Sequence, residues 1–266
     1  MIEIINKKPK PELKAVIFDF DGTISVLRAG WESVMEPLML EMITDGENPP
    51  EHLVNEVRAY IDESTGIQTA LQMEWLVKRI KSYGSAKTVH DLWWYKDEYN
   101  NRLIKNVNLR LEKLKNHELS PKDFVVLGSV EFVKALYNHG IDLYVASGTD
   151  HNDVVNEVNA LELFEFFKGV AGAPYRKKDC TKEAIIRNLM DEKKLSGSSL
   201  MVVGDGKVEI SLGSDAGAIT LGTATDEDKK YGVNPIKRER LLKAGADAII
   251  GDFSSLDELC EFTNIK

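Results

Sequence analysis

The feature that most constrains the fold of this chain is a set of four short apolar runs, each of which ends directly in a polar residue. They are residues 15–18 before Asp19, residues 143–146 before Ser147, residues 200–203 before Gly204 and Asp205, and residues 248–250 before Gly251 and Asp252. Continuous apolar runs of this length are typical of strands that are buried on both faces, as in a parallel sheet. The chain is therefore predicted to contain such a sheet.

Segments with helical spacing lie between these runs, at residues 131–138, 152–164, 182–194 and 256–262. Thr181 is placed to cap the third of them, and Ser255 with Glu258 forms a capping-box pattern at the last. The alternation predicts an α/β fold with a Rossmann-like parallel sheet flanked by helices. Ligands of such sheets lie beyond the carboxyl ends of the strands, the edge that Asp19, Ser147 and Asp205 share.

The stretch from residue 27 to residue 123 breaks this alternation. It is rich in Glu, Lys, Met, Leu and Trp at helical spacing and has no comparable strand run. Turn-forming residues at 45–50, 64–66 and 83–85 divide it into four or five helices, and Ser120-Pro121 marks the return to the sheet. We expect an α/β core domain of residues 1–26 and 124–266, with an inserted helical domain of residues 27–123.

Charge and composition limit the partners. The chain has 34 Lys and Arg against 43 Asp and Glu, a net charge of −9, which gives no general attraction to nucleic acid or to an anionic membrane. No run approaches the roughly 18 apolar residues of a membrane helix. Cys180 and Cys260 lack metal-ligand spacing and form no disulfide framework. We expect a cytoplasmic protein without nucleic-acid or membrane partners, and its oligomeric state stays open.

Two carboxylates, Asp19 and Asp21, stand two positions apart just after the first predicted strand, and Gly22 can turn the chain there. Two acids this close repel each other and raise one pKa unless a cation lies between them. The pair indicates an oxygen-ligated Mg²⁺ site or a nucleophile beside an acid/base. On these residues alone, a solvated turn with a capping aspartate is an equal alternative.

The segment 19–23, DFDGT, resembles the first motif of the haloacid dehalogenase superfamily of phosphohydrolases. The resemblance implies that Asp19 is the nucleophile that takes the phosphoryl group. It implies that Asp21 protonates the leaving oxygen and then activates water. Thr23 would add hydrogen bonds in this substrate-binding loop.

The second and third motifs of the superfamily also have counterparts. Residues 145–149, VASGT, resemble the strand that ends in Ser or Thr, so Ser147, with Gly148 beside it, would bind a phosphoryl oxygen. The third motif is a lysine that offsets the charge of aspartate and phosphate. Lys177, Lys178 and Lys182 lie in the expected stretch; Lys182 is preferred because it starts a predicted helix, and Lys178 is the second choice.

Residues 204–209, GDGKVE, resemble the fourth motif, Gly-Asp-x-x-x-Asp. The resemblance implies that Asp19, Asp205 and the backbone carbonyl of Asp21 ligate Mg²⁺. Glu209 stands where the family has the second Asp, and it is expected in the outer shell of the metal site, holding a bound water. Lys207 would pair with Glu209 or touch the ligand.

The inserted segment resembles the helical type-1 cap of the superfamily, which closes over the active site and carries substrate recognition. Arg28, Trp31 and residues 65–69, among them Gln68, are the candidate substrate contacts. The aromatic residues Trp75, Trp93, Trp94 and Tyr95 are expected in the core of the cap.

These features together predict a Mg²⁺-dependent phosphatase that acts on a small phosphate ester through an aspartyl-phosphate intermediate. A haloacid dehalogenase would not need Asp21, because halide leaves unprotonated, and no cap lysine is identified for the Schiff base of a phosphonate hydrolase. A sugar phosphomutase of the β-phosphoglucomutase type and a non-catalytic phosphate-binding module are the alternatives. Sugar phosphates, phosphoglycolate-like acids and nucleotides all stay open as substrates.

Overall fold

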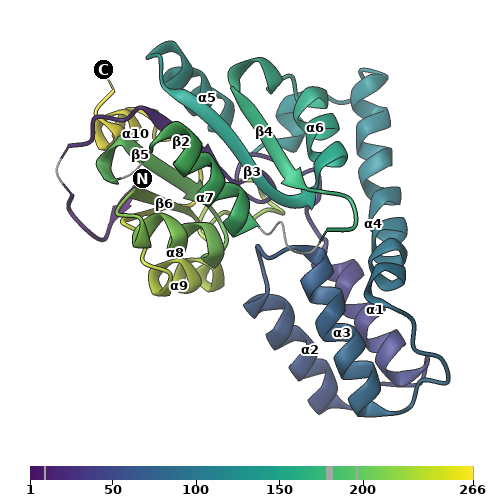
Figure 1. Ribbon diagram of the computed structural model, residues 1–266. Helices are drawn as coiled ribbons and strands as arrows, with labels where there is room; N and C mark the ends of the chain where they lie inside the picture. Colours follow the sequence, from purple (N-terminus) through teal and green to yellow (C-terminus); the bar gives the residue numbers. More distant parts are fainter. Residues whose placement is uncertain (9, 178–181, 196, 266) are drawn as a thin grey trace.

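A seven-stranded sheet forms the centre of the computed structural model, which describes residues 1–8, 10–177, 182–195 and 197–265 (Figure 1). In sheet order the strands are β1 (Glu3–Ile4), β7 (Ala248–Ile250), β6 (Ile219–Thr223), β5 (Leu200–Gly204), β2 (Ala15–Phe18), β3 (Asp142–Asp150) and β4 (Gly169–Ala173). All neighbouring pairs are parallel except β1 with β7. The parallel sheet is therefore confirmed, and all four predicted strands belong to it.

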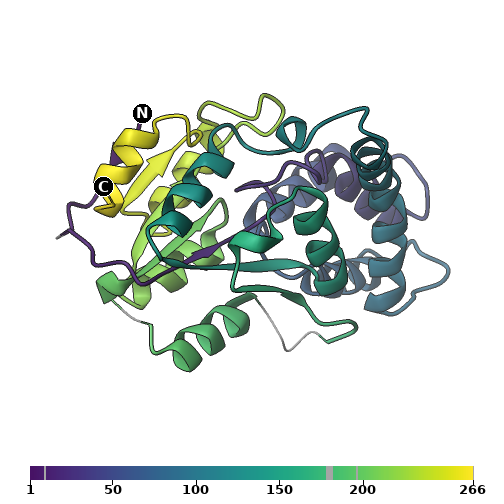
Figure 2. The same ribbon diagram turned by 90° about the horizontal axis from the view of Figure 1, so that it is seen from above.

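Helices cover both faces of the sheet (Figure 2). One face carries α5 (Ser129–Asn138), α6 (His151–Ala160) and α10 (Leu256–Thr263), and the other carries α7 (Lys182–Lys193), α8 (Lys207–Asp215) and α9 (Pro235–Lys243). Alternate residues of one strand enter different cores: Val16 packs with the first set and Ile17 with the second. Burial on both faces is why the strands are continuous apolar runs rather than alternating ones.

Two predicted helix ends differ in the structure. Helix α6 ends at Ala160, and a separate 3-10 turn at Phe164–Phe166 follows a left-handed Glu162. The capping box predicted at α10 is wrong, because its side chains bind the start of the chain: the Met1 amine donates to Ser255 Oγ and the Ile2 N–H to Glu258 Oε2. Thr181, Lys178 and Cys180 lie outside the described residues.

The inserted segment forms four helices, α1 (Glu32–Thr44), α2 (Glu51–Glu63), α3 (Thr69–Tyr83) and α4 (Leu92–Lys115). They pack around an apolar cluster of their own, which includes Tyr95 and, at its margin, Trp75. Trp94 is not part of this core: it is 41 % exposed and stacks on His90 at 4.0 Å. The expected burial of the cap aromatics is thus wrong for Trp94, and Trp93, which is half-buried, does not belong to the cluster either.

Both connections between this helical unit and the sheet pass through one short antiparallel contact. The Val26 N–H donates to the Phe124 carbonyl and the Val126 N–H to the Ile24 carbonyl, each at 2.9 Å. Just before the second connection, Ser120 caps a 3-10 turn, Pro121–Phe124, with Asp123. The domain boundaries predicted at 26/27 and 123/124 stay a prediction, which this contact supports.

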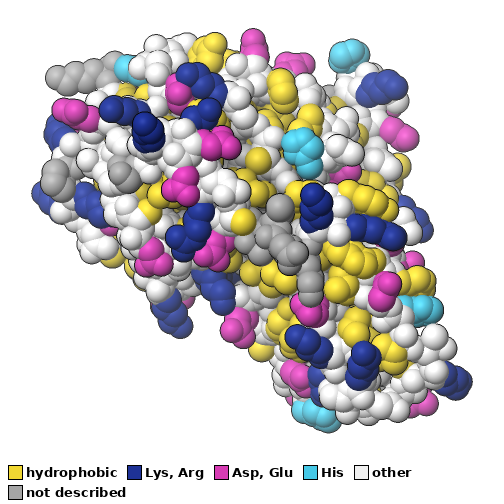
Figure 3. Space-filling view, viewed as in Figure 1, with side chains coloured by type: hydrophobic (Ala, Val, Ile, Leu, Met, Phe, Trp, Pro, Cys, Tyr) yellow, Lys and Arg dark blue, Asp and Glu magenta, His cyan; other side chains and the backbone are white. Residues whose placement is uncertain are grey.

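The surface carries charges of both signs. On the face shown in Figure 3, Lys and Arg side chains alternate with Asp and Glu side chains over both the sheet unit and the helical unit. On this face, the charges of opposite sign are interspersed.

None of the helices in the described ranges is long and apolar enough to cross a membrane.

Candidate active site

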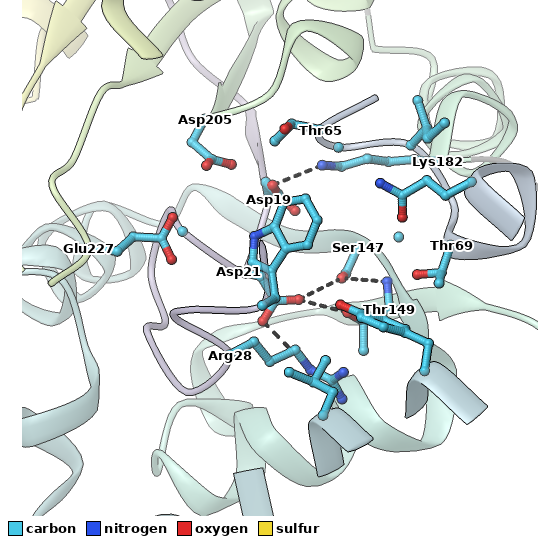
Figure 4. A pocket seen from close by; sticks show the side chains of 18 residues that line it. Asp19, Asp21, Arg28, Thr65, Thr69, Ser147, Thr149, Lys182, Asp205 and Glu227 are labelled. Atoms are coloured by element: carbon cyan, nitrogen blue, oxygen red, sulfur yellow. Dashed lines mark hydrogen bonds and ion pairs between the residues drawn. The ribbon is translucent and has the colours of Figure 1, made fainter. Parts of the chain in front are cut away.

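The side chains singled out in the sequence meet at the carboxyl edge of the sheet. Asp19 follows β2 directly, Asp205 follows β5, and Ser147 lies in β3; because β2 is hydrogen-bonded to both β3 and β5, the three are neighbours. Lys182, the first residue of α7, joins them. All four line one cavity of about 100 Å³, which the helical unit closes from the other side (Figure 4).

Asp19 is buried and held from two directions. Its Oδ2 accepts from Lys182 Nζ at 2.9 Å and its Oδ1 from the Phe20 N–H at 2.8 Å. Burial raises the pKa of Asp19 well above its ordinary value; Lys182 acts against this, whereas Glu209 and Asp205 add to it. A further cation bound near Asp19 would favour the ionised form of this carboxyl.

Lys182 also binds the last acid of the predicted motifs. Its Nζ lies 3.0 Å from Glu209 Oε2, and both side chains are at most 2 % exposed. Burial lowers the pKa of Lys182, but the charges of Asp19 and Glu209 outweigh it and raise the pKa above its usual value. Lys182 is thus a fixed positive charge beside Asp19, the place that the third motif requires.

Removal of this lysine tests the charge balance. We expect Lys182→Met to lower the free energy of unfolding of the metal-free protein by about 3 kcal/mol, because it leaves two buried carboxyl groups without their cation. Urea denaturation at neutral pH measures the loss. Lys207→Met is the matched control, since Lys207 is 40 % exposed and lies 3.9 Å from Glu63. Equal stability of both variants and wild type would contradict the role given to Lys182.

Asp21 is oriented by hydroxyl groups from the neighbouring strand. Its Oδ2 accepts from Thr149 Oγ1 at 2.8 Å and from Ser147 Oγ at 3.4 Å, whereas its Oδ1 has no hydrogen-bond partner in the described part of the chain. Gly22, at φ +74°, makes the turn; a Cβ there would lie 2.5 Å from Asp205 Oδ2. One oxygen of Asp21 is therefore held by hydroxyl groups, whereas the other lies 4.0 Å from Arg28 Nε.

Three carboxylates are close enough to share a metal ion. Asp19, Asp205 and Glu209 are all buried, and each offers an oxygen within 4.8 Å of the others. A donor set made only of oxygens suits Mg²⁺. The second oxygen of Glu209, Oε1, accepts from the Gly206 N–H at 2.7 Å, which holds this longer side chain back against its own loop. The residues present therefore fit the predicted metal.

The helical unit closes the cavity through direct contacts with the end of β3 and the loop that follows β5. A Cβ on Gly148 would lie 3.3 Å from the Ile67 carbonyl oxygen, and one on Gly66 would lie 3.4 Å from the Gly206 Cα. A second contact joins the two units: Lys96 of α4 donates to both carboxylate oxygens of Asp150, at 2.5 and 2.7 Å. The segment around Gly66 thus lies directly over the motif residues.

A family model for haloacid dehalogenase-like hydrolases matches residues 13–217, which include every motif residue described above. The chain belongs to this family. The family and the fold class predicted from the sequence, a Rossmann-like core with a helical cap, are therefore confirmed. No curated protein sequence matches the chain.

Solved structures of haloacid dehalogenase-like proteins have the same fold. A predicted phosphatase from Clostridium acetobutylicum is 18 % identical, with a TM-score of 0.60 over 94 % of this chain and 98 % of that one. A β-phosphoglucomutase from Clostridium difficile is 15 % identical, with a TM-score of 0.62 over 95 % and 97 %. CbbY from Rhodobacter sphaeroides, in complex with phosphate, is 16 % identical, with a TM-score of 0.56 over 92 % and 96 %. At these identities the likeness concerns the fold.

Arg28 lines the cavity of this hydrolase, but its charge is already balanced. Its Nε and Nη2 donate to Glu157, with the shortest distance 2.6 Å, and Nη2 also reaches Asp153 at 3.2 Å. Burial raises the pKa of Glu157 to about 7, while Arg28 acts to lower it. Arg28 Nε also lies 4.0 Å from Asp21 Oδ1, so all three acids near this guanidinium belong to the protein itself.

Two other expected substrate contacts point elsewhere. Thr23 is fully buried, with its Oγ1 3.2 Å from Thr223 Oγ1 of β6, and it does not line the cavity. Gln68 donates to the Lys177 carbonyl at 2.7 Å and ties the cap to the core. Gln72, one helical turn later, lines the cavity instead. Lys207, expected near Glu209, lies beside Glu63 of the cap.

Several residues at the site were not predicted from the sequence, among them Thr149, Gln72, Tyr99, Glu227 and Lys237. Thr149 could have been found from the sequence, since it follows Ser147 by two positions on the same strand and so shares its face.

Lys237 Nζ lies 2.8 Å from Asp205 Oδ2 and 2.5 Å from Glu227 Oε1. Although burial raises the pKa of Asp205, Lys237 holds it below its usual value. Nothing in the motif pattern distinguishes Lys237 from other lysines.

Proposed function

We propose that this hydrolase releases phosphate from a small phosphate monoester through an aspartyl-phosphate on Asp19. The observation that carries the proposal is the arrangement of Asp19 and Asp21 on one loop at the cavity. Asp19 is paired with a buried cation, and Asp21 keeps one carboxylate oxygen without a hydrogen bond among the described residues. A nucleophile beside an acid/base is what double displacement at phosphorus requires.

The reaction has two steps. In the first, an oxygen of Asp19 bonds to phosphorus, the bond to the leaving oxygen breaks, and Asp21 gives that oxygen a proton. In the second, Asp21 takes a proton from water, the water oxygen bonds to phosphorus, and the bond from phosphorus to Asp19 breaks. Lys182 balances the charge next to Asp19 in both steps, and the Ser147 hydroxyl is placed to donate to a phosphoryl oxygen.

We propose Mg²⁺ as the cofactor, held by Asp19 and Asp205, with Glu209 behind them and the carbonyl of Asp21 as a further ligand. The buried oxygen cluster supports this, and so does the raised pKa of Asp19. When bound, the ion supplies positive charge that attracts the phosphate group and favours an ionised Asp19.

The lining of the cavity supports an uncharged, hydroxylated leaving group. From the cap the cavity receives neutral hydrogen-bonding side chains, Thr69, Gln72 and Tyr99. Arg28, the cap-side cation that lines it, is paired with Glu157, so it offers little to a substrate carboxylate. We therefore propose a short sugar phosphate or polyol phosphate.

A substrate panel tests this proposal. Phosphate release is measured from glycerol 1-phosphate and other short polyol phosphates, from phosphoglycolate and from a nucleoside monophosphate, each with Mg²⁺ and with EDTA. We expect the highest kcat/KM for a polyol phosphate and loss of release in EDTA. Phosphate release that is fastest from the nucleotide, or unaffected by EDTA, would contradict the proposal. Isomerised sugar phosphate without free phosphate, formed when a sugar bisphosphate is added, would identify a mutase instead.

The pairing of Arg28 gives a specificity prediction. Glu157→Gln removes the buried carboxylate that balances this guanidinium, so we expect the kcat/KM ratio of phosphoglycolate to glycerol 1-phosphate to rise about tenfold, or about 1.4 kcal/mol. Steady-state kinetics on both substrates measures the ratio, and Glu165→Gln, at an exposed position, is the control. An unchanged ratio would show that Glu157 does not set the charge felt by the substrate.

A further inference from the structure

Lys237 and Glu227 form an ion pair beside the catalytic carboxylates that none of the four motifs contains. Lys237 lies in the first turn of α9 and is 8 % exposed, and Glu227 lies on the segment after β6 and lines the cavity. Figure 4 shows the Glu227 carboxylate on the side of the cavity where Asp205 lies, and Lys237 Nζ contacts both carboxylates. The two side chains therefore reach the site from a part of the chain beyond the last motif.

The contacts fix one oxygen of Asp205. Lys237 Nζ donates to Asp205 Oδ2 at 2.8 Å. The hydrogen bonds of the described residues include none to the other oxygen, Asp205 Oδ1. The backbone carbonyl of Asp205 accepts from Arg240 Nη2 at 3.2 Å. Lys237 thus holds the side chain of Asp205, and Arg240, one helical turn later, holds its main chain. Helix α9 therefore supports Asp205 at two points.

With Glu227 ionised, the pair adds no net charge to the site. Burial raises the pKa of Glu227 to about 7 and Lys237 acts to lower it, so the ionised form is the one that pairs with the lysine. The acidic cluster of Asp19, Asp205 and Glu209 then keeps its attraction for a divalent cation. A lone lysine on Asp205 would reduce that attraction by like-charge repulsion of the metal. The Glu227 carboxylate offsets this, which leaves the lysine free to act by orientation.

We propose that Lys237, balanced by Glu227, is a positioning residue that turns Asp205 so that its Oδ1 faces the metal site. This inference rests on the Mg²⁺-dependent function proposed above. Carboxylates that bind metal are commonly held by such outer contacts, and losing one weakens metal affinity by about 10–100-fold. An ion pair that only stabilises the core would leave the metal affinity unchanged.

The test is the Mg²⁺ affinity of the double variant Glu227→Gln/Lys237→Met, measured by calorimetric titration without substrate. The double variant keeps the net charge and the approximate volume of the pair, so we expect Mg²⁺ binding to weaken about 10-fold or more through loss of orientation alone. The control is Glu56→Gln/Arg79→Met, which removes a surface ion pair of the cap with the same change in charge. Equal affinity of wild type and the double variant would overturn the inference.

The single variant Lys237→Met separates orientation from charge. Loss of the cation alone would tighten Mg²⁺ binding, whereas loss of orientation weakens it, so we expect weaker binding and tighter binding would overturn the inference. If these variants do not fold, a crystal structure of the wild type with Mg²⁺ decides: Lys237 must stay on Asp205 Oδ2 while Oδ1 faces the ion. Wild-type protein that binds no Mg²⁺ would overturn the proposed cofactor as well.

Discussion

Replacing Asp19 with Asn is expected to lower phosphate release by on the order of 10⁴-fold or more, since the amide cannot form the covalent intermediate. The substitution conserves shape, and the Phe20 N–H still finds an oxygen acceptor at the same position. Lys182 loses its acceptor on Asp19 but keeps the carboxylate of Glu209 at 3.0 Å, so the variant is expected to fold with reduced stability. The larger loss should therefore appear in activity.

Single-turnover phosphate release with saturating enzyme measures this effect, and thermal unfolding checks that the variant is folded. Asp215→Asn, an exposed aspartate at the end of α8, is the matched control and should retain full activity. Release by the Asp19→Asn variant at the wild-type rate would show that another group attacks phosphorus.

The second large effect is expected for Asp21→Asn, and it depends on the leaving group. Loss of a positioned acid/base costs about 10²–10⁴-fold, so release from an alkyl phosphate should fall by that amount. An aryl phosphate has a leaving oxygen that needs little protonation, so the first step should be nearly unaffected and only the attack of water should slow. Thr149 and Ser147 can still donate to the asparagine oxygen, which keeps its position.

Rapid-quench kinetics on both substrates distinguishes the two steps. We expect the variant to give a burst of phenol from the aryl phosphate, followed by slow turnover, and no burst from the alkyl phosphate. Thr225→Val serves as a control for local packing. Thr225 is buried close to Glu227 in the sequence, and its Oγ1 has no hydrogen-bond partner among the described residues. An equal loss on both substrates in the first step would contradict the role of Asp21 as the acid.

The strands that the sequence predicts are those that contain an uninterrupted apolar run. Runs such as residues 15–18 and 200–203 are buried on both faces of the sheet, so every position in them is apolar. Strand β4, GVAGA, and strand β6, ITLGT, were not predicted because glycine and threonine interrupt their apolar runs. Their place in the sheet depends on pairing with neighbours, which no local pattern records.

The catalytic loop residues could be predicted because they lie next to strands. Asp19 and Asp205 are carried to one edge by the sheet itself, so their meeting follows from the fold. The ion pair of Arg28 could not be predicted in the same way, since its partner Glu157 is 129 positions away on α6. Lys237 likewise reaches Asp205 only through the packing of α9. Contacts across elements set these neighbours.

The measurement that tests the central claim most directly is the mass of the peptide that contains Asp19 after acid quenching. Asp21→Asn protein is mixed with an aryl phosphate, quenched in acid during the burst, digested and analysed by mass spectrometry. The account predicts one added phosphoryl group on Asp19 in most molecules. Turnover without a phosphoryl group on this peptide, or with the group on another residue, would contradict it.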